Sequence, residues 1–181
     1  MEFSELLKTR QSVRQYQPRP VARELLGKLV EAVRLAPSAS NAQPWKLIMV
    51  DDAELRSRVA QATYSAAVTF NRFAQEAPVI AVLVTEKAGF ITQVGAWLKK
   101  RQFSLIDIGI AAAHFCLQAA ELGLGTCILG WFDEKRIARL LGIPAGRRIG
   151  LLVTLGYAAE NYPLREKSRK GAGLMSSFNS Y

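Results

Sequence analysis

The chain has 181 residues, of which 50% are hydrophobic, and this size and composition predict one globular domain and exclude general disorder. Its net charge of +9 comes from scattered lysines and arginines, with no interleaved aromatic motif of the kind that binds RNA. No secretory signal begins the chain, and polar residues interrupt its longest apolar run. We therefore expect a cytoplasmic protein that binds neither nucleic acid nor membrane.

Apolar periodicity and helix-breaking residues predict an alternation of helices and strands. Helices are expected over 3–10, 21–36, 54–62, 64–75, 107–122 and 134–141, and strands over 45–50, 78–85, 126–129 and 149–156. The strand at 78–85 is almost wholly apolar, which indicates layers on both of its faces. The alanine-rich helix at 107–122 is apolar on nearly all sides, so it must be central to the core or to a subunit interface. The sum is an α+β or α/β domain with about four core strands and helices on both faces.

The first candidate site is an extended segment from Arg10 to Tyr16. Arg10, Ser12 and Arg14 recur at two-residue intervals, and side chains at that spacing share one face of a strand. Two cations and a hydroxyl on one face suit an anionic ligand. An exposed, charged strand has the same pattern, so the segment alone leaves both interpretations open.

The second candidate site is the loop Pro37-Ser38-Ala39-Ser40-Asn41-Ala42-Gln43-Pro44-Trp45. Small polar residues between two prolines predict a fixed, non-helical loop whose hydroxyls and amides have no neighbouring turn to satisfy. Such a loop either connects a helix to a strand or holds a ligand.

The third candidate site is a glycine-containing stretch from Gly123 to Gly130. Its glycine spacing does not fit the dinucleotide-binding fingerprint, and it follows a helix instead of opening one. Gly123 is expected to end a helix, and Gly130 to stand where backbone approaches a ligand closely.

Residue types that carry hydrolytic or metal chemistry are scarce. His114 is the only histidine, and the two cysteines, Cys116 and Cys127, have apolar neighbours in the sequence. His114 and Cys116 would point to different faces of a helix, which argues against a Cys-His dyad. We expect no metal site and no disulfide.

Two regions have no clear periodicity. The segment 86–103 is either a flap or a surface helix. The tail 161–181 carries four basic residues against one acid near its start, and it must lie on another surface or stay disordered.

Four separated features together resemble the FMN-dependent nitroreductase family in order and spacing. They are Arg10-Gln11-Ser12-Val13-Arg14, the loop 37–45, Gly123-Leu124-Gly125-Thr126 through Gly130, and Gly156-Tyr157 followed by Arg165-Glu166-Lys167. The match runs over nearly the whole chain, so residues 1–181 are expected to form a single domain of this kind. The resemblance implies a three-layer α/β/α fold with a central, mostly antiparallel sheet.

The resemblance also implies a domain-swapped homodimer with two FMN sites at the subunit interface. The helix from Asp107 would form the dimer seam, and 161–181 would wrap the partner. One subunit would supply Arg10 near the phosphate, Gln11, Ser12, and Arg14 near the flavin pyrimidine. The implied cofactor-binding set is completed by Pro37, Ser38, Ala39 and Asn41 of the other subunit, by Leu129 and Gly130 at the N5 and O4 edge, and by Arg165 and Lys167 at the phosphate.

The activity implied by the resemblance is hydride transfer from NADH or NADPH through flavin N5 to a small acceptor such as a nitroaromatic or a quinone, with ping-pong kinetics. No protein side chain would then be catalytic, because the flavin carries the chemistry. Larger family members often carry an acidic residue where Leu129 stands, so contact there would be through backbone. Alternatives are a specialised flavoenzyme of the same fold, such as a dehalogenase or ring oxidase, a flavin-binding protein without turnover, or a basic nucleic-acid-binding protein.

Overall fold

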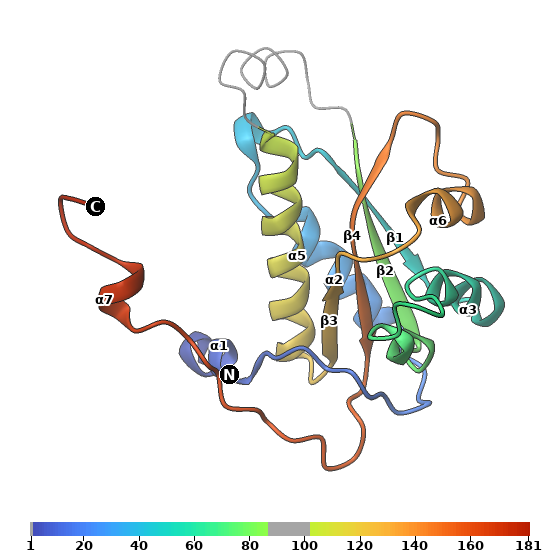
Figure 1. Cartoon of the computed structure of the whole chain (residues 1–181), viewed down its shortest axis with the longest axis horizontal. Coiled ribbons are helices and arrows are strands. Elements are labelled where there is room, and N and C mark those ends of the chain that lie inside the picture. The colour runs from blue at the N-terminus through green and yellow to red at the C-terminus, as the bar shows by residue number, and fades with distance from the viewer. Residues whose placement is uncertain (1, 87–101) are drawn as a thin grey trace.

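The computed structural model describes residues 2–86 and 102–181 (Figure 1). Its helices are α1 (Phe3–Thr9), α2 (Arg23–Arg34), α3 (Ala53–Gln61), α5 (Phe103–Glu121), α6 (Glu134–Leu140) and α7 (Ala172–Met175), with short 3-10 helices η1 (Ala39–Asn41) and η2 (Arg72–Gln75). Its strands are β1 (Trp45–Val50), β2 (Val79–Thr85), β3 (Gly125–Leu129) and β4 (Arg148–Gly156). Nearly all of the segment 86–103, expected to be either a flap or a surface helix, lies outside the described residues.

The four strands form one antiparallel sheet in the order β1-β2-β4-β3. The central strand β2 is buried along its length except at Thr85, as its apolar sequence predicted. Its side chains alternate between two cores because successive residues of a strand point to opposite faces. Ala81 and Leu83 belong to one core, and Ile80 and Val82 to the other.

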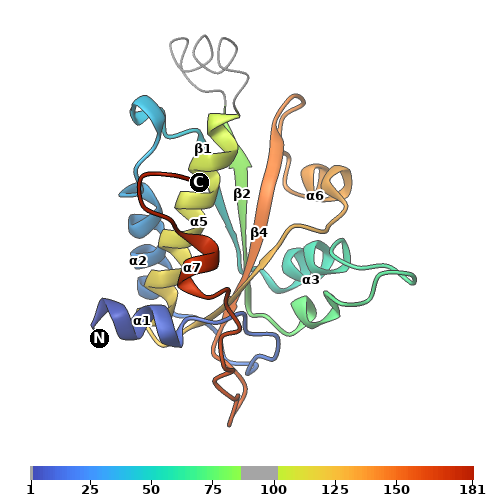
Figure 2. The same cartoon turned by 60° about the vertical axis from the view of Figure 1, so that its left-hand side comes forward.

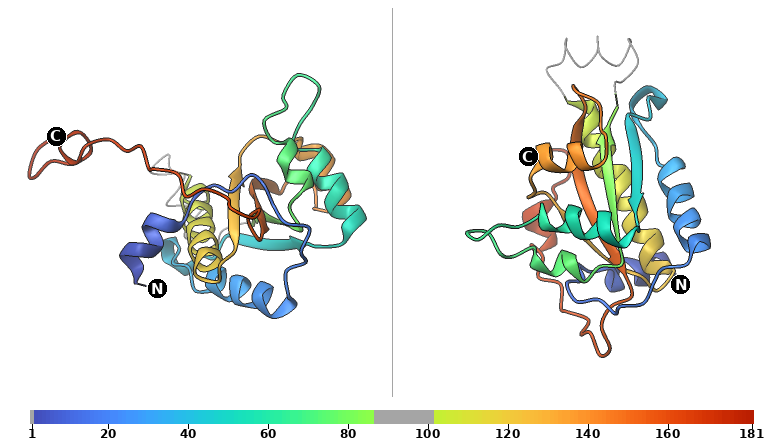
Figure 3. Two further views of the ribbon diagram at one scale, coloured as in Figure 1. Left: turned by 90° about the horizontal axis from the view of Figure 1, so that it is seen from below. Right: turned by 90° about the vertical axis from the view of Figure 1, so that its right-hand side faces the viewer.

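Helices cover both faces of the sheet. The first core lies between the sheet and α2 and α5, where Leu29 and Phe115 are fully buried. The second lies between the sheet and α3 and α6, where Val59 and Ile137 are fully buried. The views in Figures 1 and 3 show these layers on either side of the strands. The predicted three-layer α/β/α arrangement is thereby confirmed.

Helix α5 is the central helix of the fold. Ile108, Ala111 and Phe115 face the core that β2 and β4 share, while Leu105 and Ile106 near its start are about half exposed. By length and composition α5 is the one described helix that passes as a membrane span, and it packs here as a core helix against α2 and the sheet. The exposed apolar side chains near the start of α5 can therefore contact a surface other than this core.

The structure lacks one predicted α-helix and starts another earlier than predicted. Residues 64–75 form a loop that ends in η2 instead of a helix, because local side-chain bonds compete with helical ones. Ser65 Oγ accepts from Val68 N at 3.1 Å, and Asn71 Nδ2 donates to Thr63 O at 3.2 Å. Helix α5 begins at Phe103, four residues before the predicted start at Asp107.

The C-terminal segment leaves the body of the chain after passing beneath the sheet. It runs beside the N-terminal extended segment and then projects away through α7, as Figures 1 and 2 show. Leu174 and Phe178 are 82% and 91% exposed, although both are apolar. Residues after about 168 therefore have little of this chain to pack on.

Candidate functional site

The extended segment from Arg10 to Gln17 lies across the end of the sheet, beside β3. Ser12 forms a parallel bridge with Thr126, and Val13 N donates to Thr126 O at 2.9 Å. A Cβ at Gly125 would lie 2.7 Å from a methyl of Val13, so only glycine allows this approach. The predicted extended conformation is confirmed, and it is fixed by the start of β3.

A buried tyrosine supports this segment from below. Tyr16 Oη donates to Val13 O at 2.9 Å and lies 2.8 Å from Thr154 Oγ1 on β4. Burial raises the pKa of the Tyr16 phenol far above its usual range. Tyr16 is therefore a neutral structural group and not an acid or a base.

A cavity of about 250 Å³ gathers cations from both ends of the chain. It is lined by Arg10, Gln11, Ser12, Arg14, Arg165, Glu166, Lys167 and Arg169. This set includes every site residue predicted from the Arg10–Arg14 motif and from the tail. Arg169 was not predicted, although it belongs to the basic run that the sequence shows in the tail.

The cations of this cavity are held by backbone oxygens. Lys167 Nζ donates to Arg10 O at 2.7 Å, and Arg165 Nη2 donates to Ser12 O at 2.8 Å. Within 2–86 and 102–181, none of the cavity's arginines or Lys167 forms an ion pair with a carboxylate. Burial, with nearby Arg10 and Arg169, lowers the pKa of the Lys167 ammonium. The cavity therefore has five cationic side chains against the one carboxylate of Glu166, an excess of positive charge suited to a strongly anionic group.

Gly130 directly follows β3 and faces open space. A Cβ built on it would meet nothing within 4 Å, and its φ is not in the left-handed region. Neither packing nor backbone conformation of this chain therefore requires glycine there. The Leu129 side chain is buried in the core, so this corner presents backbone alone to a ligand.

Aromatic residues that the sequence did not single out lie beside these groups. The Arg14 guanidinium lies 5.9 Å from the centre of the Phe73 ring. Asn71 Nδ2 donates to Trp131 O at 3.1 Å, which ties the 64–71 loop to the residue after Gly130. Trp131 and Phe70 stack edge to face at 6.4 Å and are both more than half exposed. No periodicity marks these residues, because a turn and a strand end bring them together.

The third predicted group, Pro37 to Asn41, lies in a loop of unusual backbone conformation. Ser40, Asn41 and Gln43 all have positive φ, between 44° and 52°, which is costly for residues other than glycine. Ser38 Oγ accepts from Gln43 N at 2.9 Å and steadies the turn. The Ala39 N–H donates to Asp107 Oδ1 at 3.1 Å, and this carboxylate is almost fully buried.

One chain does not bring this loop to the cation cavity. The loop is anchored near the start of α5 at Asp107, whereas Ser12 lies by Thr126, just past the other end of the helix. From Asp107 to Ala119, in the last turn of α5, the helix rises over twelve positions, which is about 18 Å along its axis. Figure 1 shows the loop and the N-terminal segment at opposite ends of α5.

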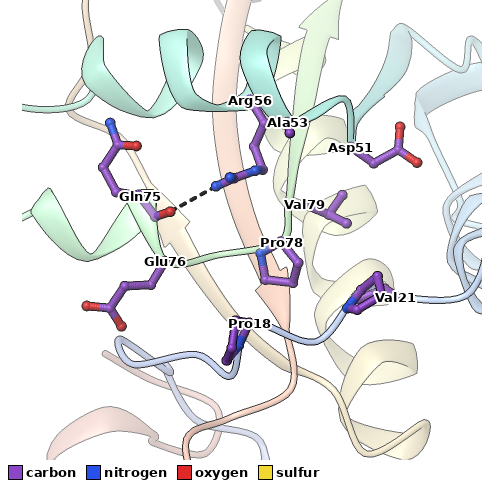
Figure 4. A pocket seen from close by; sticks show the side chains of 10 residues that line it. Pro18, Val21, Asp51, Ala53, Arg56, Gln75, Glu76, Pro78 and Val79 are labelled. Atoms are coloured by element: carbon purple, nitrogen blue, oxygen red, sulfur yellow. Dashed lines mark hydrogen bonds between the residues drawn. The ribbon is translucent and has the colours of Figure 1, made fainter.

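A second cavity, of about 410 Å³, lies between the 18–21 segment, the start of α3 and the start of β2 (Figure 4). Its arginine, Arg56, donates to Gln75 O at 2.8 Å and Ala77 O at 2.9 Å. Its carboxylates are also engaged, Asp51 by Arg23 and Glu76 by the Tyr16 N–H. These contacts tie α3 to the segment that precedes β2, and the charged groups of this second cavity are all engaged within the protein.

The fold and site define a class of protein: an α/β/α domain with a cation-rich site for an anionic ligand near the start of β3 and open backbone at Gly130, after the end of that strand. The family model described as the nitroreductase family matches residues 7–157, and the chain belongs to this family. It is accordingly an enzyme, an oxidoreductase. Arg165 and Lys167 lie beyond the matched residues.

Similar proteins agree with this assignment. A putative NADH dehydrogenase/NAD(P)H nitroreductase of Methanothermobacter thermautotrophicus is 33% identical over 170 residues, which cover 92% of this chain and 82% of the relative. An FMN-dependent nitroreductase structure from Clostridium difficile has a TM-score of 0.75 at 28% identity, covering 97% of this chain and 98% of that one. A nitroreductase family structure from Streptococcus pneumoniae has a TM-score of 0.81 at 23% identity, covering 98% and 100%, and supports the fold.

Proposed function

We propose that this chain is a cytoplasmic, FMN-dependent oxidoreductase that acts as a homodimer and uses NADH or NADPH to reduce a small acceptor. The observation that carries the proposal is the cation-rich cavity near the start of β3, with the open backbone of Gly130 after the end of the same strand. The names of two relatives support it, since one is called an NAD(P)H nitroreductase and the other an FMN-dependent nitroreductase.

The residues present fit a flavin mononucleotide. Its phosphate carries nearly two negative charges, and Arg10, Arg165 and Lys167 supply cations from the wall of one cavity. Each charge-assisted hydrogen bond to such a phosphate contributes about 1.5 to 3 kcal/mol. The space where a Cβ of Gly130 would lie is open, so the flavin ring edge can approach the backbone there. Arg14 would lie by the pyrimidine, where a fixed cation favours the anionic, reduced form.

Bound FMN would supply the hydride chemistry, accepting two electrons from the nicotinamide and passing them on. The protein's part is to bind, orient and hold charge. The described residues contain no cluster of three or more metal-ligating side chains, and Tyr16 is locked in a buried network. Positioning by Arg14, Ser12 and Gly130 is therefore the contribution we assign to this chain.

A dimer explains why the predicted site residues lie at two ends of α5. A site that needs both the Arg10 cavity and the Ser38–Asn41 loop takes the loop from a second copy, since one chain holds them apart. The half-exposed Leu105 and Ile106 give α5 an apolar surface for that copy. The tail 161–181, with exposed Leu174 and Phe178, would lie across it.

The acceptor is proposed to be a flat aromatic molecule such as a nitroaromatic or a quinone. Trp131, the residue after Gly130, forms an exposed aromatic pair with Phe70, and aromatic rings stack favourably on such surfaces. Donor and acceptor would occupy the same place in turn, which predicts ping-pong kinetics with parallel double-reciprocal lines.

The experiment that tests the function is the absorption spectrum of the purified protein, followed by identification of the cofactor released by heat. Flavin bands with FMN as the released species are expected, together with NAD(P)H oxidation that depends on an added quinone. A colourless protein that takes up no added FMN would refute the proposal. Intersecting lines with several acceptors would remove the shared pocket and leave the cofactor assignment intact.

A further inference from the structure

One side-chain amide joins the two segments that carry the cations. Gln11 Nε2 donates to Pro163 O at 2.9 Å, and Gln11 Oε1 accepts from Arg165 N at 3.0 Å. The side chain thus pairs with the backbone on both sides of Leu164, much as a residue in a neighbouring strand does. Gln11 was predicted to bind the cofactor, yet both ends of its amide are engaged with the protein's own backbone.

A tyrosine hydroxyl makes a second junction at the same place. Tyr162 Oη accepts from Arg14 N at 3.1 Å and from Arg165 Nη2, and it donates to Ser12 O at 3.4 Å. The Arg165 guanidinium also lies 5.6 Å from the centre of the Tyr162 ring. One donor and two acceptor positions of the phenol are therefore all in use.

Together the two residues fix an otherwise exposed arginine. Gln11 holds the Arg165 main chain, and Tyr162 with the Ser12 carbonyl holds the guanidinium. A long side chain that is already ordered loses less conformational freedom when a ligand binds, and this raises affinity without any new contact to the ligand.

We propose that Gln11 and Tyr162 are positioning residues that preorganise Arg165 for the phosphate of the flavin. This role rests on the proposed function, because it needs a phosphate-bearing ligand in the cation cavity. Neither residue has to touch the flavin. Their effect is therefore expected to be specific to the phosphate and to pass through Arg165.

The test uses the full-length protein, stripped of flavin and titrated with FMN and separately with riboflavin, which lacks the phosphate. Gln11→Ala and Tyr162→Phe are each expected to raise the Kd for FMN about tenfold, equivalent to about 1.4 kcal/mol. For Gln11→Ala the Kd for riboflavin is expected to stay within about twofold; Tyr162→Phe also loses the contact with Arg14 N, so its Kd for FMN is expected to rise more than its Kd for riboflavin. Tyr162→Phe keeps the ring and removes the hydroxyl alone, so it serves if Gln11→Ala folds poorly.

Gln17 provides a matched control. Its Nε2 donates to Ala158 O at 2.8 Å, so it joins the same two segments, but it does not line the cation cavity. Gln17→Ala is expected to leave the FMN Kd within about twofold. A weakening by Gln17→Ala equal to that by Gln11→Ala would mean general loosening and overturn the positioning role.

A double-mutant comparison separates indirect from direct action. In the Arg165→Ala background, Gln11→Ala is expected to add less than about twofold, since residues that act through one another are not additive. A full additional tenfold loss would show direct contact and overturn the role. If the wild-type protein binds no FMN, the proposed function fails; if it binds FMN and both variants bind equally well, only the positioning role fails.

Discussion

Asp107 on α5 accepts a hydrogen bond at 3.1 Å from the main-chain N–H of Ala39. The carboxylate is 2% exposed, and the loop that it holds contains three non-glycine residues with positive φ. A buried acceptor at the end of α5 remote from the Arg10 cavity thus anchors this costly loop conformation to the helix, while Ser38 Oγ steadies the turn itself. This bond decides where the loop can be presented to a second chain.

Asp107→Ala is expected to lower the free energy of unfolding by about 1 to 3 kcal/mol, because the loop N–H loses a charged acceptor. FMN affinity should fall as well, since the loop is no longer fixed. Urea denaturation and flavin titration measure the two effects. Asp107→Asn keeps an acceptor oxygen and should lie much nearer the wild type; equal damage from both variants would contradict the assigned role of the bond.

Gly130→Val is expected to leave the protein folded and to abolish tight flavin binding. The open space beside Gly130 accommodates a side chain in the protein itself, but a ligand there would be displaced. Unchanged thermal unfolding of the flavin-free protein together with a Kd for FMN raised at least about tenfold, or about 1.4 kcal/mol, is the expected pair of results. Normal FMN binding by this variant would remove Gly130 from the site.

Gly125→Ala is the matching control. Unlike Gly130→Val, it should destabilise the fold. Its Cβ would press on Val13 at under 3 Å, so the extended segment has to shift. We expect a loss of about 1 to 3 kcal/mol in the free energy of unfolding, the usual cost of overpacking. A fully stable Gly125→Ala variant would show that the segment is not pinned by β3.

Arg14→Ala is expected to leave the dimer intact and to lower the midpoint potential of the bound flavin by about 30 mV, or 1.4 kcal/mol for a two-electron couple. The fixed cation stabilises the reduced, anionic flavin more than the oxidised form. Spectroelectrochemistry measures the shift, and Arg19→Ala, whose cation lies over Tyr157, serves as the control. An unchanged potential would move Arg14 away from the pyrimidine edge.

FMN binding is expected to weaken at a lower alkaline pH than it would with a lysine of ordinary pKa. Burial and the neighbouring cations lower the pKa of Lys167 from 10.5, so it loses its proton at a lower pH. Phosphate prefers the protonated form, and affinity should therefore fall as pH rises through the lowered pKa. Lys167→Arg should remove this fall, and riboflavin should not show it.

The free energy of unfolding should also depend on Lys167, but it should rise with pH where FMN affinity falls. Between the lowered pKa of Lys167 and 10.5, the unfolded chain holds a proton that the folded chain has released. The free energy of unfolding of the flavin-free protein should therefore gain from this group as pH rises through that interval. A decrease traceable to Lys167 would contradict the lowered pKa.

The layered fold could be predicted from local sequence patterns, because tertiary contacts did not override the local preferences of the strands. The boundaries of β1 and the burial of β2 were predicted correctly, because runs of apolar, β-branched residues have few alternatives. The 64–75 helix was wrong because bonds from Ser65 and Asn71 to nearby backbone favour a loop. Periodicity does not register such bonds.

The candidate site was only half accessible to sequence reasoning. Arg10, Ser12 and Arg14 line one cavity, as the sequence predicted, but Gln11 lines it too, so strand alternation does not account for the whole lining. Tyr162 and Trp131 were missed because their neighbours are about 150 and 60 positions away in the chain. Long-range contacts of this kind leave no periodic trace, and only the fold shows them.

The separation of the two groups by α5 has a consequence for chains that are mixed. A chain with Arg165→Ala has a defective cation cavity and an intact 37–45 loop. A chain with Asp107→Ala has a defective loop and an intact cavity. If each site takes one part from each chain, a hybrid of these two proteins carries one site with both defects and one with neither. Two preparations that each bind FMN weakly, unfolded and refolded together, would then contain sites that bind FMN more tightly than either preparation does alone.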